Sequence, residues 1–161
     1  MTVAEAEALL ACYALPVRMA EMDPAPDMVA TTVEISDNPS FGALVPFGRS
    51  GVPIEVFGDR SCRALPLSDV DAAELVRSVA AWPLLCGYGG AAPVETAAIE
   101  DVLLRAARLC DDLPEIDRLS FTALAHARGA DIQAPTVHVR PTTARAQEVP
   151  RRADRSEPMS T

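Results

Sequence analysis

The sequence predicts an α+β fold, in which a mostly antiparallel sheet of about five strands is covered by two long helices. Short runs rich in Val, Thr and Phe, bounded by Gly, Pro and Ser, are typical of strands. Two longer segments after residue 68 carry apolar residues at helical spacing. Strand-like runs after these segments complete the expected sheet.

A short amphipathic helix is expected at residues 3–13, near the start of the chain. Its apolar positions follow helical spacing and are Ala4, Ala8, Leu9 and Cys12. Residues 14–17 should be extended, because Pro16 disfavours helix at the residue before it. A Pro-rich turn at 22–27 then leads into residues 28–35, which are rich in Val and Thr and predict a strand.

Residues 38–67 are the most informative stretch and contain three of the four Phe residues. Two apolar runs separated by Gly and Ser predict a buried strand, a tight turn and a second strand. Gly48 and Gly51 are expected to frame this turn.

The two long helices are predicted at residues 69–80 and 94–113. Ser68 is a suitable N-cap with Asp71 three residues later, which is a capping-box pattern. Residues 83–93, rich in Gly and Pro, are expected to form the loop between them.

Two further strands are predicted at 116–125 and 132–139, with Ala134-Pro135 indicating an irregular or edge strand. From Pro141 the chain lacks apolar periodicity, which predicts a disordered tail at 141–161 after one folded domain at 1–140.

Composition and charge exclude several classes of protein. The formal net charge of −9 and the lack of a basic stripe before the tail argue against a nucleic-acid partner. Apolar runs are too short for a membrane helix, and the N-terminus lacks a basic leader, so we expect a soluble cytoplasmic protein. All 14 basic residues are Arg, so no Lys can hold a nucleotide phosphate.

The cysteines and histidines do not form a recognisable metal site. The four Cys lie far apart without a C-x-x-C pair, and reduced thiols are expected. His126 and His138 have no Cys, Asp or Ser neighbour at ligand or triad spacing, and we expect them at the surface or at strand ends.

Residues 38–67, which we call the central stretch, resemble part of a known family. The similarity is to the C-terminal half of the ATP-grasp domain of NDP-forming (ADP-forming) acyl-CoA synthetases, of the acetate–CoA ligase type. That family runs D-P-x-F-G-P, G-L-G-G, E-V-x-x-D and F-R-x-x-P-L, which is similar to residues 38–67 here. Residues 5–13 match E-A-x-x-L-L-x-x-Y, and residues 84–88 match L-L-x-G-Y. The long family segment with the ATP lid is missing between residues 17 and 28.

The resemblance implies candidate nucleotide-binding positions at Glu55, Asp59 and Arg63, with Gly48 and Gly51 in the turn. An alternative interpretation from the residues alone is that Glu55, Asp59 and Arg63 form a local carboxylate–Arg network that fastens two strands together.

Other positions depart from the family pattern. Ser120 and Thr122 stand where the family's L-D-I-N-P-L strand has Asp and Asn, and Ala30 aligns with a family Glu. Glu34 falls in a different register from that Glu. Mg²⁺ prefers carboxylate and amide oxygens, and these departures from the family pattern remove such groups. The comparison with the family therefore implies no catalytic residues, metal ligands or cofactor in this chain.

The sequence therefore favours a non-catalytic interaction or regulatory protein. The alternative is an enzyme fragment, completed by a partner chain, that binds nucleotide with Mg²⁺ or CoA. Expected partners are a second copy of the chain or an acyl-CoA synthetase subunit. Loss of the lid half should expose apolar side chains, among them some of Leu44, Pro46, Ile54 and Phe57, which favours a homodimer.

Overall fold

The computed structural model describes residues 1–18, 23–38, 40–50 and 60–140, so the predicted tail at 141–161 lies outside it. One five-stranded sheet has the order β3-β2-β1-β4-β5, and all its neighbouring strands are antiparallel. The strands are β1 (Val29–Asn38), β2 (Gly42–Arg49), β3 (Arg60–Ala64), β4 (Ile116–His126) and β5 (Gly129–Val139). The predicted α+β class is confirmed.

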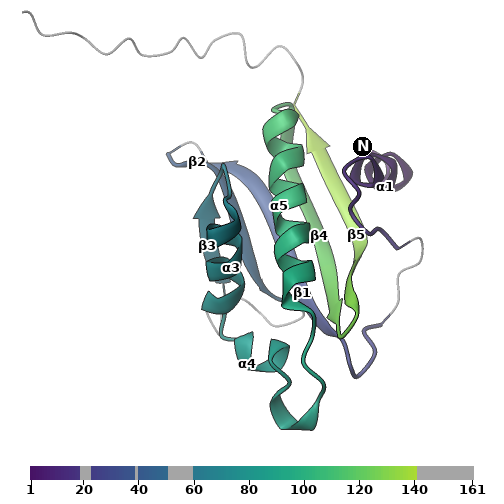
Figure 1. The fold of residues 1–161 in the computed structure, drawn as a ribbon. Coiled ribbons are helices and arrows are strands. Elements are labelled where there is room, and N and C mark those ends of the chain that lie inside the picture. The colour runs from purple at the N-terminus through teal and green to yellow at the C-terminus, as the bar shows by residue number, and fades with distance from the viewer. Residues whose placement is uncertain (19–22, 39, 51–59, 141–161) are drawn as a thin grey trace, which may run out of the picture.

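Two helices cover one side of the sheet (Figure 1). The longer, α5 (Thr96–Asp112), contacts β1, β4 and β5, and α3 (Asp69–Ser78) lies against α5 and β3. The N-terminal helix α1 (Val3–Cys12) packs against β5. The helix predicted at 69–80 ends earlier, at Ser78, because Val79 takes an extended conformation (φ −78°, ψ 145°).

The hydrophobic core fills the space between the sheet and these helices. Val33, Val45 and Phe47 project from β1 and β2 and are fully buried. They meet apolar side chains from α5, among them Ile99 and Leu103. The helical stripe and strand alternation seen in the sequence therefore converge on one core.

Short helical turns occupy the predicted loop at 83–93. They are α4 (Trp82–Leu85) and the 3₁₀ turn η1 (Tyr88–Gly90). Pro83 fits the first turn of α4, where an amide donor is not needed. Gly87 has φ 90°, and a Cβ there would lie 2.6 Å from the Ala91 carbonyl oxygen, so this close turn requires glycine.

The β1–β2 pairing is interrupted at Pro46. Pairs are formed from Thr31↔Arg49 to Val33↔Phe47 and resume at Ser36↔Leu44. Proline has no N–H to donate, so the ladder is broken opposite Glu34.

The strand that pairs with β2 is described from Arg60 onwards. The described pairs run from Gly48↔Arg60 to Leu44↔Ala64, and β3 is assigned to Arg60–Ala64. Gly48 is a buried residue within β2, and the chain turns at Ser50. The tight turn that Gly48 and Gly51 are expected to frame stays a prediction. Gly51 and the apolar run after it lie outside the described residues.

The expected irregularity of the last strand is confirmed, but it lies in the middle of β5. Ala134 has φ 51°, and the β4–β5 register shifts between Ser120↔Thr136 and Thr122↔Gln133. This is a bulge in an edge strand. Of the helices in the described ranges, none is long and apolar enough to cross a membrane.

Candidate ligand-binding face

The side of the sheet away from α3 and α5 carries a row of polar residues. Because strand residues alternate between faces, the neighbours of buried Val33 and Phe121 point to this other side. Cross-strand pairing brings six of them together, and we name this set the polar face: Thr32, Glu34, Ser120, Thr122, Gln133 and Thr136. Its centre is formed by the pairs Thr32↔Thr122 and Glu34↔Ser120.

Glu34 belongs to this face, which sequence reasoning missed. Glu34 does not align with the family Glu at Ala30, yet residues four apart in a strand point to the same side. Ala30 pairs with Leu124, and Glu34 lies further along β1 next to Ser120. The spacing of four residues between Ala30 and Glu34 was the signal in the sequence that could have placed Glu34 on this face.

The carboxylate of Glu34 is engaged by an arginine. Arg118 Nε lies 3.6 Å from Glu34 Oε1. The Glu34 side chain is 22% exposed and that of Arg118 is 55% exposed, so water screens only part of this attraction. A guanidinium in this place competes with any cation for the carboxylate.

The donor set on the polar face does not fit Mg²⁺, the ion that an ATP-grasp site implies. Ser120 and Thr122 offer neutral hydroxyls, and Glu34 offers a carboxylate already paired with Arg118. Mg²⁺ is held in nucleotide sites by carboxylates together with phosphates. Within the described ranges, no group of three His, Cys, Asp or Glu side chains is placed to hold a metal ion.

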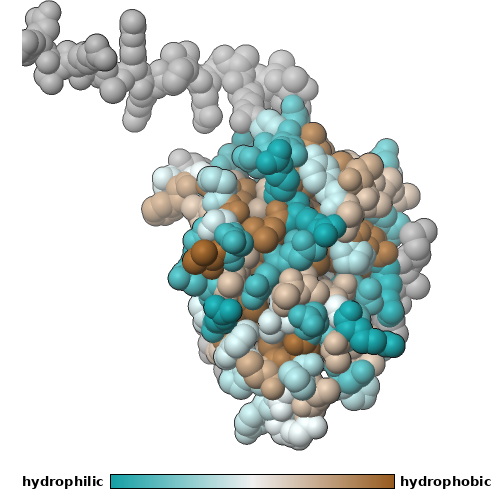
Figure 2. All heavy atoms as spheres, in the orientation of Figure 1, coloured by the Kyte–Doolittle hydropathy of each residue, from teal (hydrophilic) through white to brown (hydrophobic). Residues whose placement is uncertain are grey.

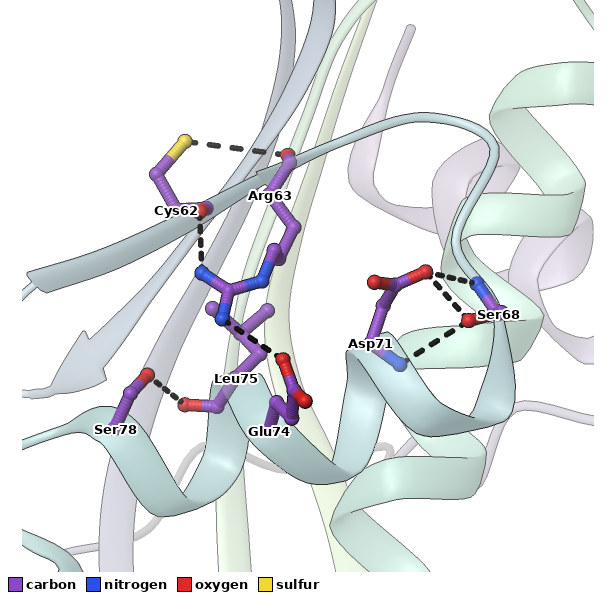
Figure 3. Close-up of polar contacts among 7 residues, drawn as sticks. All are labelled: Cys62, Arg63, Ser68, Asp71, Glu74, Leu75 and Ser78. Carbon is purple, nitrogen blue, oxygen red and sulfur yellow. Dashed lines mark hydrogen bonds and ion pairs between the residues drawn. The ribbon is translucent and has the colours of Figure 1, made fainter.

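Arg63 lies on the opposite side of the sheet from the polar face. It pairs with Val45, which is buried under the helices, so both side chains point towards α3. Its Nη2 lies 3.4 Å from Glu74 Oε2 on α3, and its Nη1 donates to the Cys62 carbonyl at 3.1 Å (Figure 3). The structure thus does not bring Arg63 together with Ser120.

Three of the predicted nucleotide-binding positions cannot be placed. Glu55, Asp59 and Gly51 lie outside the described residues. The local network expected among Glu55, Asp59 and Arg63 therefore stays a prediction, although Arg63 does pair with a carboxylate, that of Glu74.

Arg140 connects two strands at one end of the sheet. Its Nη2 donates to Asp37 Oδ2 and its Nε donates to Asp117 Oδ1, each at 2.7 Å. Hydrogen bonds from Arg140 to Asp37 and then Asp117 raise the pKa of the guanidinium. One side chain just after β5 therefore links the ends of β1 and β4.

The two histidines lie at a strand end and on the surface. His126 ends β4, where Arg128 N–H donates to its Nδ1 at 3.2 Å and Asp131 Oδ2 lies 3.6 Å from its Nε2. Asp131 also pairs with Arg18 at 3.1 Å. His138 is exposed on β5. These contacts fix the β4–β5 turn.

Exposed apolar side chains are scattered. Among the described residues, the large ones are Met1, Val3, Phe41, Val70, Tyr88 and Val139. On the side that carries α3 and α5, small apolar areas alternate with hydrophilic ones (Figure 2). Leu44 and Pro46 are half-buried and pair with the exposed residues Ala64 and Cys62 of β3. Ile54 and Phe57 lie outside the described residues, so the expected apolar patch stays a prediction.

Comparison with known proteins agrees with the fold. A family model described as an ATP-grasp domain matches residues 16–131. The beta subunit of acetate–CoA ligase [ADP-forming] I from Pyrococcus furiosus is 34% identical over 87 residues, which are 54% of this chain and 38% of that protein. Acetate–CoA ligase [ADP-forming] I from Archaeoglobus fulgidus is 40% identical over 84 residues, 52% of this chain and 12% of that protein.

A solved structure has the same arrangement. Dinucleotide-forming acetyl-coenzyme A synthetase 1 from Ca. Korarchaeum cryptofilum superposes with a TM-score of 0.67 and 35% identity, covering 72% of this chain and 55% of that one. The chain thus spans only about half of that structure and 38% of the Pyrococcus subunit. The protein belongs to the ATP-grasp domain family, covers part of that domain, and is related to the ADP-forming acetate–CoA ligases.

Proposed function

We propose that this chain is a non-catalytic interaction or regulatory protein of the cytoplasm, derived from the ATP-grasp domain of NDP-forming acyl-CoA synthetases. The observation that carries the proposal is the polar face. Ser120 and Thr122 replace the Asp and Asn of the family pattern, and Glu34 is paired with Arg118.

The need of phosphoryl transfer for positive charge around the phosphates supports the same proposal. Its transition state is stabilised by metal ions and cationic side chains around the phosphates. The chain has no Lys, and the hydroxyls of Ser120 and Thr122 cannot balance the charge of a metal–phosphate complex.

The test is an assay of the purified chain with ATP, Mg²⁺, acetate and CoA. We expect neither CoA-thioester formation nor ATP hydrolysis above a no-protein control. Ligand binding is tested separately by a thermal-shift series with ATP, ADP, CoA and acetyl-CoA, each with and without Mg²⁺. A ligand at 100 times its Kd would add about 2.7 kcal/mol to the free energy of unfolding. Thioester formation by the chain alone would refute the proposal.

The second candidate is an enzyme fragment that becomes active with a partner chain. Its support is the partial coverage of relatives, of which the Pyrococcus protein is itself a beta subunit. Adding a synthetase subunit that carries the rest of the ATP-grasp domain should then produce ATP-dependent thioester synthesis. No gain in rate on addition favours the first candidate.

We further propose that the polar face is covered by another subunit, and a second copy of this chain is the simplest one. Light scattering should then give a mass near twice the 17.1 kDa of one chain. Thr122→Arg, which places a charge on the polar face, should lower this mass. The control is Ala97→Arg, at an exposed position of α5, which should not. A monomer at high micromolar concentration would contradict self-association.

A further inference from the structure

One edge of the sheet is formed by β3. Among the described strands only β2 flanks it. Leu65 N–H donates to the Ala43 carbonyl at 2.9 Å, which sets the alternation of hydrogen bonds along the pair. By this alternation the backbone N–H and C=O of Arg63 face β2, and those of Cys62 and Ala64 point away from it. Outward-pointing groups of this kind can pair with another strand.

The Arg63 side chain covers part of this edge. It starts on the helix side of β3, and its Nη1 reaches the outward Cys62 carbonyl at 3.1 Å. Glu74 holds the other end of the guanidinium at 3.4 Å, as Figure 3 shows. A charged group across an edge is one of the means by which proteins prevent edge-to-edge pairing.

We propose that Arg63 guards the outer edge of β3, and that its removal opens this edge to β3 of a second copy of the chain. This inference goes beyond the proposed function and does not depend on it. With Arg63 in place, an incoming strand meets an occupied carbonyl at Cys62 and a guanidinium with a positive charge.

A second copy is the occupant because the outer edge of β3 is self-complementary. Two β3 strands related by a two-fold axis at Cys62 run antiparallel, so the outward N–H of each Cys62 meets the carbonyl of the other. This hydrogen-bonded pairing separates the two Cα atoms by about 5.5 Å. Two-fold pairing of the same surface is the commonest form of self-association.

Arg63→Ala is the direct test. Sedimentation at high micromolar concentration should give the variant a mass about twice that of the wild type under the same conditions. Cys62 supplies a second readout, because it is exposed and Cα separations of about 4.4–6.8 Å permit a disulfide. Diamide, which accepts the two electrons and two protons of the thiols, should link Cys62 to Cys62 in Arg63→Ala and much more slowly in the wild type.

A rescue variant separates edge protection from a general structural role. Ala64→Pro removes an outward N–H without removing a bond to β2. Added to Arg63→Ala, it should restore the wild-type mass, whereas mere loss of packing would not be rescued. Arg77→Ala, at an exposed position of α3, removes the same charge and should leave the mass unchanged.

Several outcomes would overturn the inference. A folded Arg63→Ala variant with the wild-type mass is one, and an equal increase in Arg77→Ala is another. Disulfides that avoid Cys62 would also contradict the assigned edge. If Arg63→Ala fails to fold, Arg63→Met takes its place in the test. It keeps a long side chain on β3 and removes the positive charge and the donor to the Cys62 carbonyl, so its mass should also exceed that of the wild type.

Discussion

Among the described residues, Phe47 is the largest fully buried side chain. It pairs with Val33 on β1 and Ser61 on β3, and thus lies on the middle strand of the β1–β2–β3 part of the sheet. Phe41, which is 75% exposed, belongs to the same central stretch. Two Phe residues six positions apart therefore have opposite environments, which composition alone does not reveal.

Phe47→Ala should lower the free energy of unfolding by about 3–5 kcal/mol, because it leaves a cavity under α3 and α5. Phe41→Ala is the matched control and should change it by less than about 0.5 kcal/mol. Urea unfolding followed by circular dichroism measures both. Equal effects would mean that the core has been assigned to the wrong face of β2.

Cysteine reactivity tests the burial of single residues in another way. Burial raises the pKa of the Cys110 thiol to about 12, whereas Cys12, Cys62 and Cys86 are exposed. The thiolate is the reactive form, so Cys110 should stay unmodified at pH 8. Titration with a thiol reagent should modify three cysteines in the native protein and all four after unfolding. Rapid labelling of Cys110, located by peptide mass, would contradict its burial.

At the scale of elements, periodicity predicted most helices and strands and failed where pairing is not local. The helical stripe of α5 and the Ser68 capping box of α3 are local signals, and both were visible in the sequence. By contrast, β3 has only five residues, two of them Arg, and its assignment depends on pairing with β2. The polar face could not be assembled either, because Glu34 meets Ser120 only when β1 pairs with β4.

The N-terminus of α3 should make stability depend on pH. Hydrogen bonds from the Ser68 side chain, and then from its backbone N–H, lower the pKa of Asp71. A carboxylate with a lowered folded pKa contributes stability above its unfolded pKa, near 4, and loses it as the pH falls through the folded pKa.

Asp71→Asn should therefore be less stable than the wild type at pH 7, and this difference should shrink below about pH 4. Thermal unfolding between pH 2 and 7 measures the difference. Asp69→Asn removes the same charge from the first turn of α3 and leaves the Ser68–Asp71 contacts in place. A pH-independent difference for Asp71→Asn would show that the capping carboxylate is not the cause.

At the scale of the whole molecule, Arg140 and the residues after it should contribute differently to stability. Residues after 140 are predicted to contribute little, because they have too little apolar surface to offset the entropy of ordering. Arg140 itself links Asp37 and Asp117. The boundary of the folded domain should therefore fall directly after this residue.

Two truncations test this boundary. Ending the chain after Arg140 should leave the melting temperature nearly unchanged. Ending it one residue earlier also removes both ion pairs, and should cost about 0.5–2 kcal/mol, since both pairs are partly exposed. A large loss in the longer variant would mean that the predicted tail packs on the domain.

The central seam between β1 and β4 has a kinetic consequence. Strands β1, β2 and β3 follow one another closely, and β4 and β5 form a hairpin, so both units can form by local closure. The seam instead joins residues distant in sequence, as in the buried hydrogen bond from Thr31 Oγ1 to the Ala123 carbonyl, 92 positions apart. Bringing together segments so far apart in sequence costs loop-closure entropy, and this cost makes the pairing of β1 with β4 slow. Thr31→Val, which removes the hydroxyl that donates to the Ala123 carbonyl, should therefore slow folding more than it speeds unfolding.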